Sequence, residues 1–152
     1  MNLARAVLAF LALPGTVAFV VHVLLVDHAR RFDPFSLLLL LPGLGGLFAC
    51  VVSFYVEGRG TLAPWSPPQH LVRGGLYRYS RNPMYVAVVL ILWGWAAAFH
   101  SATLAFYSLA VMTVFHLRVV LGEEPWLARA HGEAWDRYKA AVPRWIGPRG
   151  QV

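Results

Sequence analysis

Three long stretches of the chain contain no formally charged residue, and their lengths predict how the polypeptide is arranged. The first covers residues 6–26, the second covers 35–56, and the third covers the 36 residues of 82–117. A helix that crosses a membrane needs about 20 apolar residues, each adding about 1.5 Å. The first two stretches therefore each predict one membrane-spanning helix, and the third is long enough for two.

The third stretch is expected to fold back on itself. As one helix it would be about 54 Å long, against a hydrocarbon core of about 30 Å. The sequence Phe99-His100-Ser101-Ala102 predicts the turn, with Ser101 or Thr103 capping the following helix. We therefore expect an all-α integral membrane protein, a single domain over 1–152, with four spans at about 4–26, 35–56, 84–99 and 103–121.

After the fourth span the pattern becomes that of an amphipathic helix. Apolar residues recur at helical spacing while charged residues take the opposite face, and Pro143 is expected to end the helix. In isolation such a segment is typical of a helix lying at a membrane interface. The apolar positions that predict this cytoplasmic C-terminal helix are Trp126, Leu127, Ala130, Ala134, Trp135, Tyr138 and Ala141.

Composition and charge support a membrane protein and suggest its orientation. The chain is 59% hydrophobic and 13% charged, about half the charge of a soluble domain, which excludes a soluble enzyme. With four spans, eleven basic residues lie on the side of both termini and the 57–83 loop, against two, Arg30 and Arg31, on the other. The positive-inside rule places the first side in the cytoplasm. The net charge of +6 thus reflects topology, and nucleic acid is not an expected partner.

Cysteine and histidine add little candidate chemistry. The single cysteine, Cys50, excludes an internal disulfide, and the histidines show no spacing typical of metal ligands, so no metal site is expected. In the second span, Gly43, Gly46 and Ala49 recur at helical spacing and predict close packing against another helix.

The segment 57–85 is longer than a simple connection requires, which is typical of a functional loop. Its prolines and glycines exclude a regular helix. Arg81-Asn82-Pro83 opens the third span, with Pro83 in its first turn. The N–H groups and the positive dipole end at the start of that helix suit an anion such as a carboxylate.

Two adjacent carboxylates, Glu123 and Glu124, stand where the fourth span leaves the membrane. Such groups are costly at that position and need a cationic partner, from the protein or from a ligand. In the simpler alternative they pair with arginines of the protein and begin the next helix, with Pro125 at its first position. The candidate arginines for that alternative are Arg78, Arg81 and Arg118.

Two motifs flank the predicted hairpin. Before it stands Gly75-Leu-Tyr-Arg-Tyr-Ser-Arg-Asn-Pro-Met-Tyr85, and after it stand Glu123-Glu124-x-x-Leu127 and Gly132-x-x-Trp-x-x-Tyr138-x-x-x-Val-Pro-Arg144. In this order and separation they resemble the signatures of the isoprenylcysteine carboxyl methyltransferase-like family, the first of which reads G-x-Y-x-x-x-R-[HN]-P-x-Y. Gly58-x-Gly-Thr-x-x-Pro-Trp65 resembles the lead-in of the small bacterial members, and the likeness covers residues 57–148.

The resemblance implies an enzyme of the bacterial inner (plasma) membrane that transfers a methyl group from S-adenosyl-L-methionine. Its cofactor pocket would be cytoplasmic, between segments 57–85 and 118–148. Arg118 stands beside the position of the substrate-binding arginine of eukaryotic members, and Asn82 replaces their histidine, which removes a titratable group. The cofactor contacts implied by alignment are Gln69, His70, Leu71, Val72, Tyr77, Asn82, Pro83, Met84, Tyr85 and Glu123.

The chemistry of the cofactor agrees with this set. Glu123 or Glu124 can bind its ammonium, and an arginine or the N–H groups near Asn82 can bind its carboxylate. Aromatic side chains such as Tyr77 and Tyr85 can face the sulfonium or stack on adenine. We expect a lipophilic acceptor that enters from the bilayer, and we take Arg118 and Glu124 as the candidate catalytic residues.

The acceptor itself stays open. The carboxylate of an isoprenylcysteine-like substrate needs no general base at pH 7, whereas a thiol or an amine would need to lose a proton, which His70 or Glu124 could accept. A lipid headgroup is a further option. Two other classes compete with a transferase: a non-catalytic membrane ligand-binding relative, and a reductase that shares the hairpin. The chain lacks a G-x-G-x-x-G pattern for a nicotinamide cofactor.

Overall fold

The computed structural model describes residues 16–17, 24–25, 32–57 and 71–147. Within these ranges the protein is helical and contains no strand, which confirms the all-α class for the part described. The elements, in chain order, are η2 (Pro34–Ser36), α3 (Leu37–Val56), η3 (Gly75–Arg78), α4 (Pro83–Ala98), α5 (Ala102–Arg118), the π-helical turn η4 (Val119–Glu123), α6 (Glu124–His131) and α7 (Glu133–Ala141).

Two helical stretches are long and apolar enough to cross a membrane, Pro34–Ser53 and Ala102–His131, and α4 is a shorter apolar helix between them. The spans expected at 35–56, 84–99 and 103–121 correspond to α3, α4 and α5. The span expected at 4–26 lies almost entirely outside the described residues, so the count of four remains a prediction.

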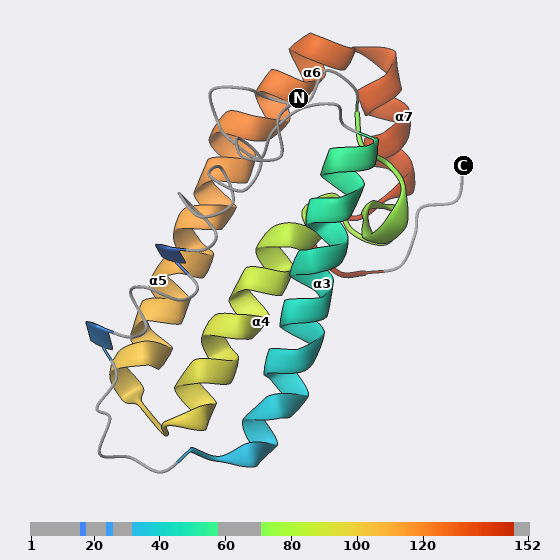
Figure 1. Cartoon of the computed structure of the whole chain (residues 1–152). Helices are drawn as coiled ribbons and strands as arrows, with labels where there is room; N and C mark the ends of the chain where they lie inside the picture. The colour runs from blue at the N-terminus through green and yellow to red at the C-terminus, as the bar shows by residue number, and fades with distance from the viewer. Residues whose placement is uncertain (1–15, 18–23, 26–31, 58–70, 148–152) are drawn as a thin grey trace.

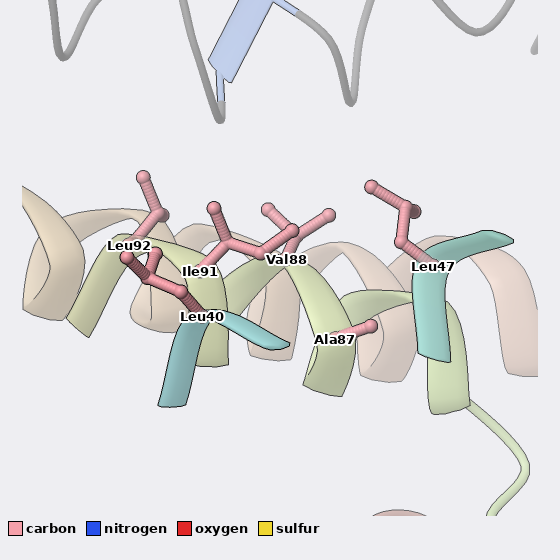
Figure 2. Close-up of a cluster of buried hydrophobic side chains, with 6 residues drawn as sticks. All are labelled: Leu40, Leu47, Ala87, Val88, Ile91 and Leu92. Carbon is pink, nitrogen blue, oxygen red and sulfur yellow. The ribbon is translucent and has the colours of Figure 1, made fainter. Parts of the chain in front are cut away.

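Helix α4 lies between α3 and α5, and its most extensive packing is against α3 (Figure 1). The fully buried side chains of the core between α3 and α4 are all aliphatic, as Figure 2 shows. The close approach expected from the small residues of α3 is confirmed at Gly43, where an added Cβ would stand 2.8 Å from a side-chain carbon of Ile91. The core side chains are Leu40, Leu47, Ala87, Val88, Ile91 and Leu92.

The hairpin between α4 and α5 turns where the sequence predicts. Helix α4 ends at Ala98, and the side chain of Ser101 accepts a hydrogen bond from the backbone N–H of Leu104. Of the two predicted caps, Ser101 is therefore the one used. The backbone N–H of Asp33, just before α3, donates to the carbonyl of Ala98 at 2.8 Å, which ties the start of α3 to the end of α4.

The prediction of one continuous C-terminal helix is wrong. Gly132, with φ 49° and ψ −128°, separates α6 from α7. This positive φ favours glycine, because residues that carry a side chain rarely adopt it. Upstream, η4 joins α5 to α6 without a break. The expected end before Pro143 is confirmed, since α7 ends at Ala141. The apolar face of α7 packs inward, with Trp135 and Tyr138 buried.

Candidate functional site

The adjacent carboxylates lie at the junction of η4 and α6, beside the beginning of α4 and the segment that follows α7. Each carboxylate belongs to a separate hydrogen-bonded cluster. We call them the Glu123 cluster, made of Glu123, Tyr85 and Arg118, and the Glu124 cluster, made of Glu124, Arg81 and Arg144.

The Glu123 cluster joins α4 to the end of α5. The hydroxyl of Tyr85 donates a short hydrogen bond to Oε1 of Glu123. Nε of Arg118 donates to the same oxygen at 2.8 Å and also to the Tyr85 hydroxyl at 3.1 Å. The ring of Tyr85 is fixed against Phe115, with 4.4 Å between centroids. The side chains of Glu123 and Arg118 are 33% and 44% exposed, so both charges are accessible from outside the protein.

The Glu124 cluster is more enclosed, with side-chain exposures of 11% for Glu124 and 7% for Arg81. Arg144 binds the carboxylate through two nitrogens, Nε at 2.7 Å and Nη2 at 2.9 Å, and Nη1 of Arg81 adds a third bond at 2.9 Å. The guanidinium of Arg81 lies over the ring of Trp135, 5.3 Å from its centroid. Both carboxylate oxygens are thus already occupied by protein donors, which is the arrangement of a structural clamp.

The pKa values of the two arginines of this clamp shift in opposite directions. Burial lowers the pKa of Arg81 from its ordinary value, while the carboxylate of Glu124 opposes the shift. The hydrogen bond to Glu124 raises the pKa of Arg144. Both side chains remain cationic at neutral pH because an arginine loses its proton only in strong alkali. Glu124 therefore carries two permanent positive partners.

Residues 143–146, which we call the C-terminal strap, cross the beginning of α4. The carbonyl of Pro143 accepts from the backbone N–H of Arg81 at 2.9 Å. The carbonyl of Arg144 accepts from the Ser80 hydroxyl at 3.3 Å and from Nδ2 of the Asn82 side chain at 3.1 Å. Further along, Nε1 of Trp145 donates to Nδ1 of His116 on α5 at 3.3 Å. The predicted site residue Asn82 thus holds the strap.

Several other predicted cofactor residues contribute to the packing beneath the site. Val72 and Tyr77 are buried together with Cys50, and Leu71 packs against the buried cluster of α7. The hydroxyl of Tyr138 donates to the carbonyl of Tyr77 at 2.8 Å. Burial raises the pKa of both tyrosines. Met84 also packs against the core, while Gln69 and His70 lie outside the described residues.

An open groove of about 390 Å³ runs between α3 and α4. Its walls are almost entirely apolar, and the predicted site residue Pro83 is one of them. The α4 residues of the groove share one face of the helix, whereas Tyr85 lies about half a turn away. The groove and the Glu123 cluster are thus on opposite faces of α4. Among its lining residues are Gly45, Gly46, Ala49, Pro83, Val86 and Ile146.

The sequence anticipated part of this arrangement. The structure brings together Tyr85, Arg118 and Glu123, and it pairs Glu124 with Arg81, one of the arginines suggested as a partner. Sequence reasoning missed Arg144 as the bidentate partner of Glu124. The available signal was its place at the end of the second motif, immediately after the proline that stops α7.

Comparison with known proteins places the chain among membrane transferases. A family model described as phospholipid methyltransferase matches residues 40–134, which is well over half of the chain. The match extends from the core of α3 into α7 and therefore includes both carboxylates. No curated protein and no solved structure matches the chain. Among the described residues, no group of three or more His, Cys, Asp or Glu side chains is placed to hold a metal ion.

Proposed function

The chain belongs to the phospholipid methyltransferase family, the membrane methyltransferases that its motifs resemble, and on that premise we propose that it transfers a methyl group from S-adenosylmethionine to a lipophilic acceptor. The family accounts for the two long apolar helices and for polar motifs at one end of the hairpin. The site proposed for the cofactor is the Glu123 cluster, open to the aqueous side.

The single observation that carries this proposal is the partly exposed carboxylate of Glu123, held by Tyr85 and Arg118. A carboxylate in this setting can bind the ammonium of an amino-acid moiety by a charge-assisted hydrogen bond. Arg118, the more exposed partner, can turn to bind a carboxylate of the cofactor or of the acceptor. The face of the Tyr85 ring suits a sulfonium.

When bound, S-adenosylmethionine supplies an electrophilic methyl group on a positively charged sulfur. The work left to the protein is to align the acceptor and to exclude water. Tyr85 and Arg118 fix the geometry around Glu123, and the strap covers the beginning of α4. Because both oxygens of Glu124 already accept from arginines, we assign Glu124 to positioning the strap instead of to proton removal. An acceptor that needs no general base, such as a carboxylate, fits this assignment best.

The proposed acceptor carries a hydrocarbon chain. Two features support this class: the description of the family and the apolar groove between α3 and α4. A chain lying in that groove would bring its head to Tyr79 and Ser80, next to the start of α4. Because the groove and the Glu123 cluster are on opposite faces of α4, the head would have to pass around the first turn of this helix to meet the cofactor. The carboxylate of an isoprenylcysteine-like molecule, a thiol, an amine and a lipid headgroup remain the acceptor options, to be separated by assay.

The proposed setting is a bacterial inner membrane with both termini and the site in the cytoplasm. The distribution of arginine and lysine supports this orientation. It would give the polar cofactor access from the cytoplasm and the acceptor access from the bilayer.

The test is a binding and transfer assay on the purified full chain in detergent. Calorimetry should show binding of S-adenosylhomocysteine and weaker binding of adenosine, which lacks the amino-acid moiety that Glu123 is proposed to hold. A methyl-labelled donor is then offered with prenylated thiols, prenylated carboxylates and phospholipids. Absence of binding at millimolar ligand, together with absence of label in every acceptor, would show that the chain is not a methyltransferase.

A further inference from the structure

The contact between Arg118 and Glu123 has a spacing that an α-helix does not allow. The two residues are five positions apart, yet Nε of Arg118 is 2.8 Å from Oε1 of Glu123. In an α-helix, side chains three or four positions apart are neighbours. A residue five positions on points about 140° away, because each residue adds about 100°. A regular helix would therefore separate these two groups.

The π-helical turn η4 removes that separation. It covers Val119–Glu123, and the backbone N–H of Glu124 donates to the carbonyl of Val119, five residues earlier. A π-turn holds one more residue than the α-helical turn it replaces. Glu123 consequently takes the place, relative to Arg118, that residue 122 would have in an uninterrupted α-helix.

The same extra residue also decides where Glu124 points. With the turn in place, Glu123 meets Tyr85 and Glu124 meets the arginine pair. Without it, Gly122 would face Arg118, and both carboxylates would rotate past their partners. Val119 is fully buried and fixes the start of the turn against the helix bundle. At the other end, the three hydrogen bonds of Glu124 fix α6.

We propose that η4 is a positioning element of the transferase site, in which one inserted residue sets the register of two adjacent carboxylates, so that Glu123 serves the ligand and Glu124 holds the strap. This inference rests on the proposed function, because it assigns Glu123 to the cofactor. Gly122 is the residue to exploit in a test: an added Cβ there would have no atom within 4 Å, so a side chain can be introduced without a clash.

The decisive experiment moves the carboxylate by one position. Glu123→Gln is combined with Gly122→Glu, and the Kd for S-adenosylhomocysteine is measured by calorimetry on the full chain. If the π-turn sets the register, the double variant stays at least tenfold weaker than the unmodified protein, as weak as Glu123→Gln alone. Recovery of the Kd to within threefold would show that a carboxylate one α-helical turn after Arg118 suffices, and would overturn the inference. Gly122→Glu alone is measured as well, so that the effect of the added carboxylate on the Kd is separated from the loss of the original one.

A deletion tests the same idea in the opposite direction. Removing Gly122 lets the turn close to an α-helix with Glu123 four positions after Arg118, so the Kd should change by less than about fivefold. Thr113 is exposed and lies in the regular part of α5. Its deletion shifts the register of the helix with no neighbouring π-turn to compensate, and should therefore abolish binding. A deletion of Gly122 that is as damaging as the deletion of Thr113 would contradict the proposal. Failure of the unmodified protein to bind at all would instead refute the proposed function.

Discussion

Glu123 and Glu124 are the same residue type at consecutive positions, but the structure gives them different surroundings. Glu123 is a third exposed and shares one oxygen between a tyrosine and a single arginine whose side chain is 44% exposed. Glu124 is nearly enclosed and uses both oxygens to hold two arginines. The first carboxylate can exchange a partner for a ligand at little cost, whereas the second cannot release its partners without leaving a buried charge. Exposure and the number of protein donors, not residue type, separate a binding group from a structural one.

The largest expected effect is on stability, from Glu124→Gln. This change leaves the guanidinium of Arg81, 7% exposed, without its anion, and breaking a buried pair from one side costs about 3 kcal/mol. The Tm measured by thermal unfolding in detergent should fall by several degrees. Glu133→Gln, at an exposed position in the first turn of α7, is the matched control and should lower the Tm far less. Equal Tm values for the two variants would mean that the Glu124 cluster is not a clamp.

The second-largest effect should be a loss of affinity for S-adenosylhomocysteine. Glu123→Gln removes the proposed partner of the cofactor ammonium, and a hydrogen bond to a charged group is worth about 1.5–3 kcal/mol. The Kd for S-adenosylhomocysteine should therefore rise about 10–100-fold, while the Tm changes little. Glu123→Asp should recover part of the affinity. If Glu123→Gln lowers the Tm as much as Glu124→Gln does, the contrast between the two carboxylates is lost.

A smaller effect, on the KM for the acceptor, should distinguish the groove from the Glu123 cluster on the opposite face of α4. Gly45 lines the groove, and an added Cβ would meet nothing within 4 Å, so Gly45→Leu fills the groove without straining α3. We expect the KM for a long-chain acceptor to rise about fivefold, since a filled apolar groove loses roughly 1 kcal/mol of burial. The Kd for the cofactor should be unchanged. Ala110→Leu, on the exposed side of α5, is the control. Equal KM values for the two variants would remove the groove from the acceptor path.

The smallest effect concerns the support beneath both clusters. Tyr138→Phe removes the hydrogen bond to the carbonyl of Tyr77, worth about 0.5–1 kcal/mol. Burial raises the pKa of Tyr138 above its ordinary value of 10.0, so its contribution to stability is complete below pH 10 and is lost as the pH rises beyond it. The Tm of the unmodified protein should fall above pH 10, and the variant should show a shallower fall. Identical slopes in the two alkaline titrations would exclude Tyr138 as the source.

Two elements show how far the sequence alone leads. The hairpin between α4 and α5 follows from a charge-free stretch too long for one span and from a serine at the turn, both readable from local sequence. The C-terminal region was predicted as one helix because its apolar periodicity continues across Gly132. The structure breaks it there, since α7 must turn to bury Trp135 and Tyr138 against the segment before α4.

The sequence by itself determined the helical class, the membrane character, the family and the need of two carboxylates for cationic partners. These properties follow from composition, periodicity and motif order, which can be identified from the order of the residues alone. Only the tertiary structure decided which carboxylate each arginine binds. That choice depends on a single extra residue in η4 and on the strap bringing Arg144 back to the start of α4, 62 positions from Asn82 in the sequence. Hydrogen bonds are short and directional, so the partner is fixed by the folded geometry, and no spacing pattern in the sequence specifies it.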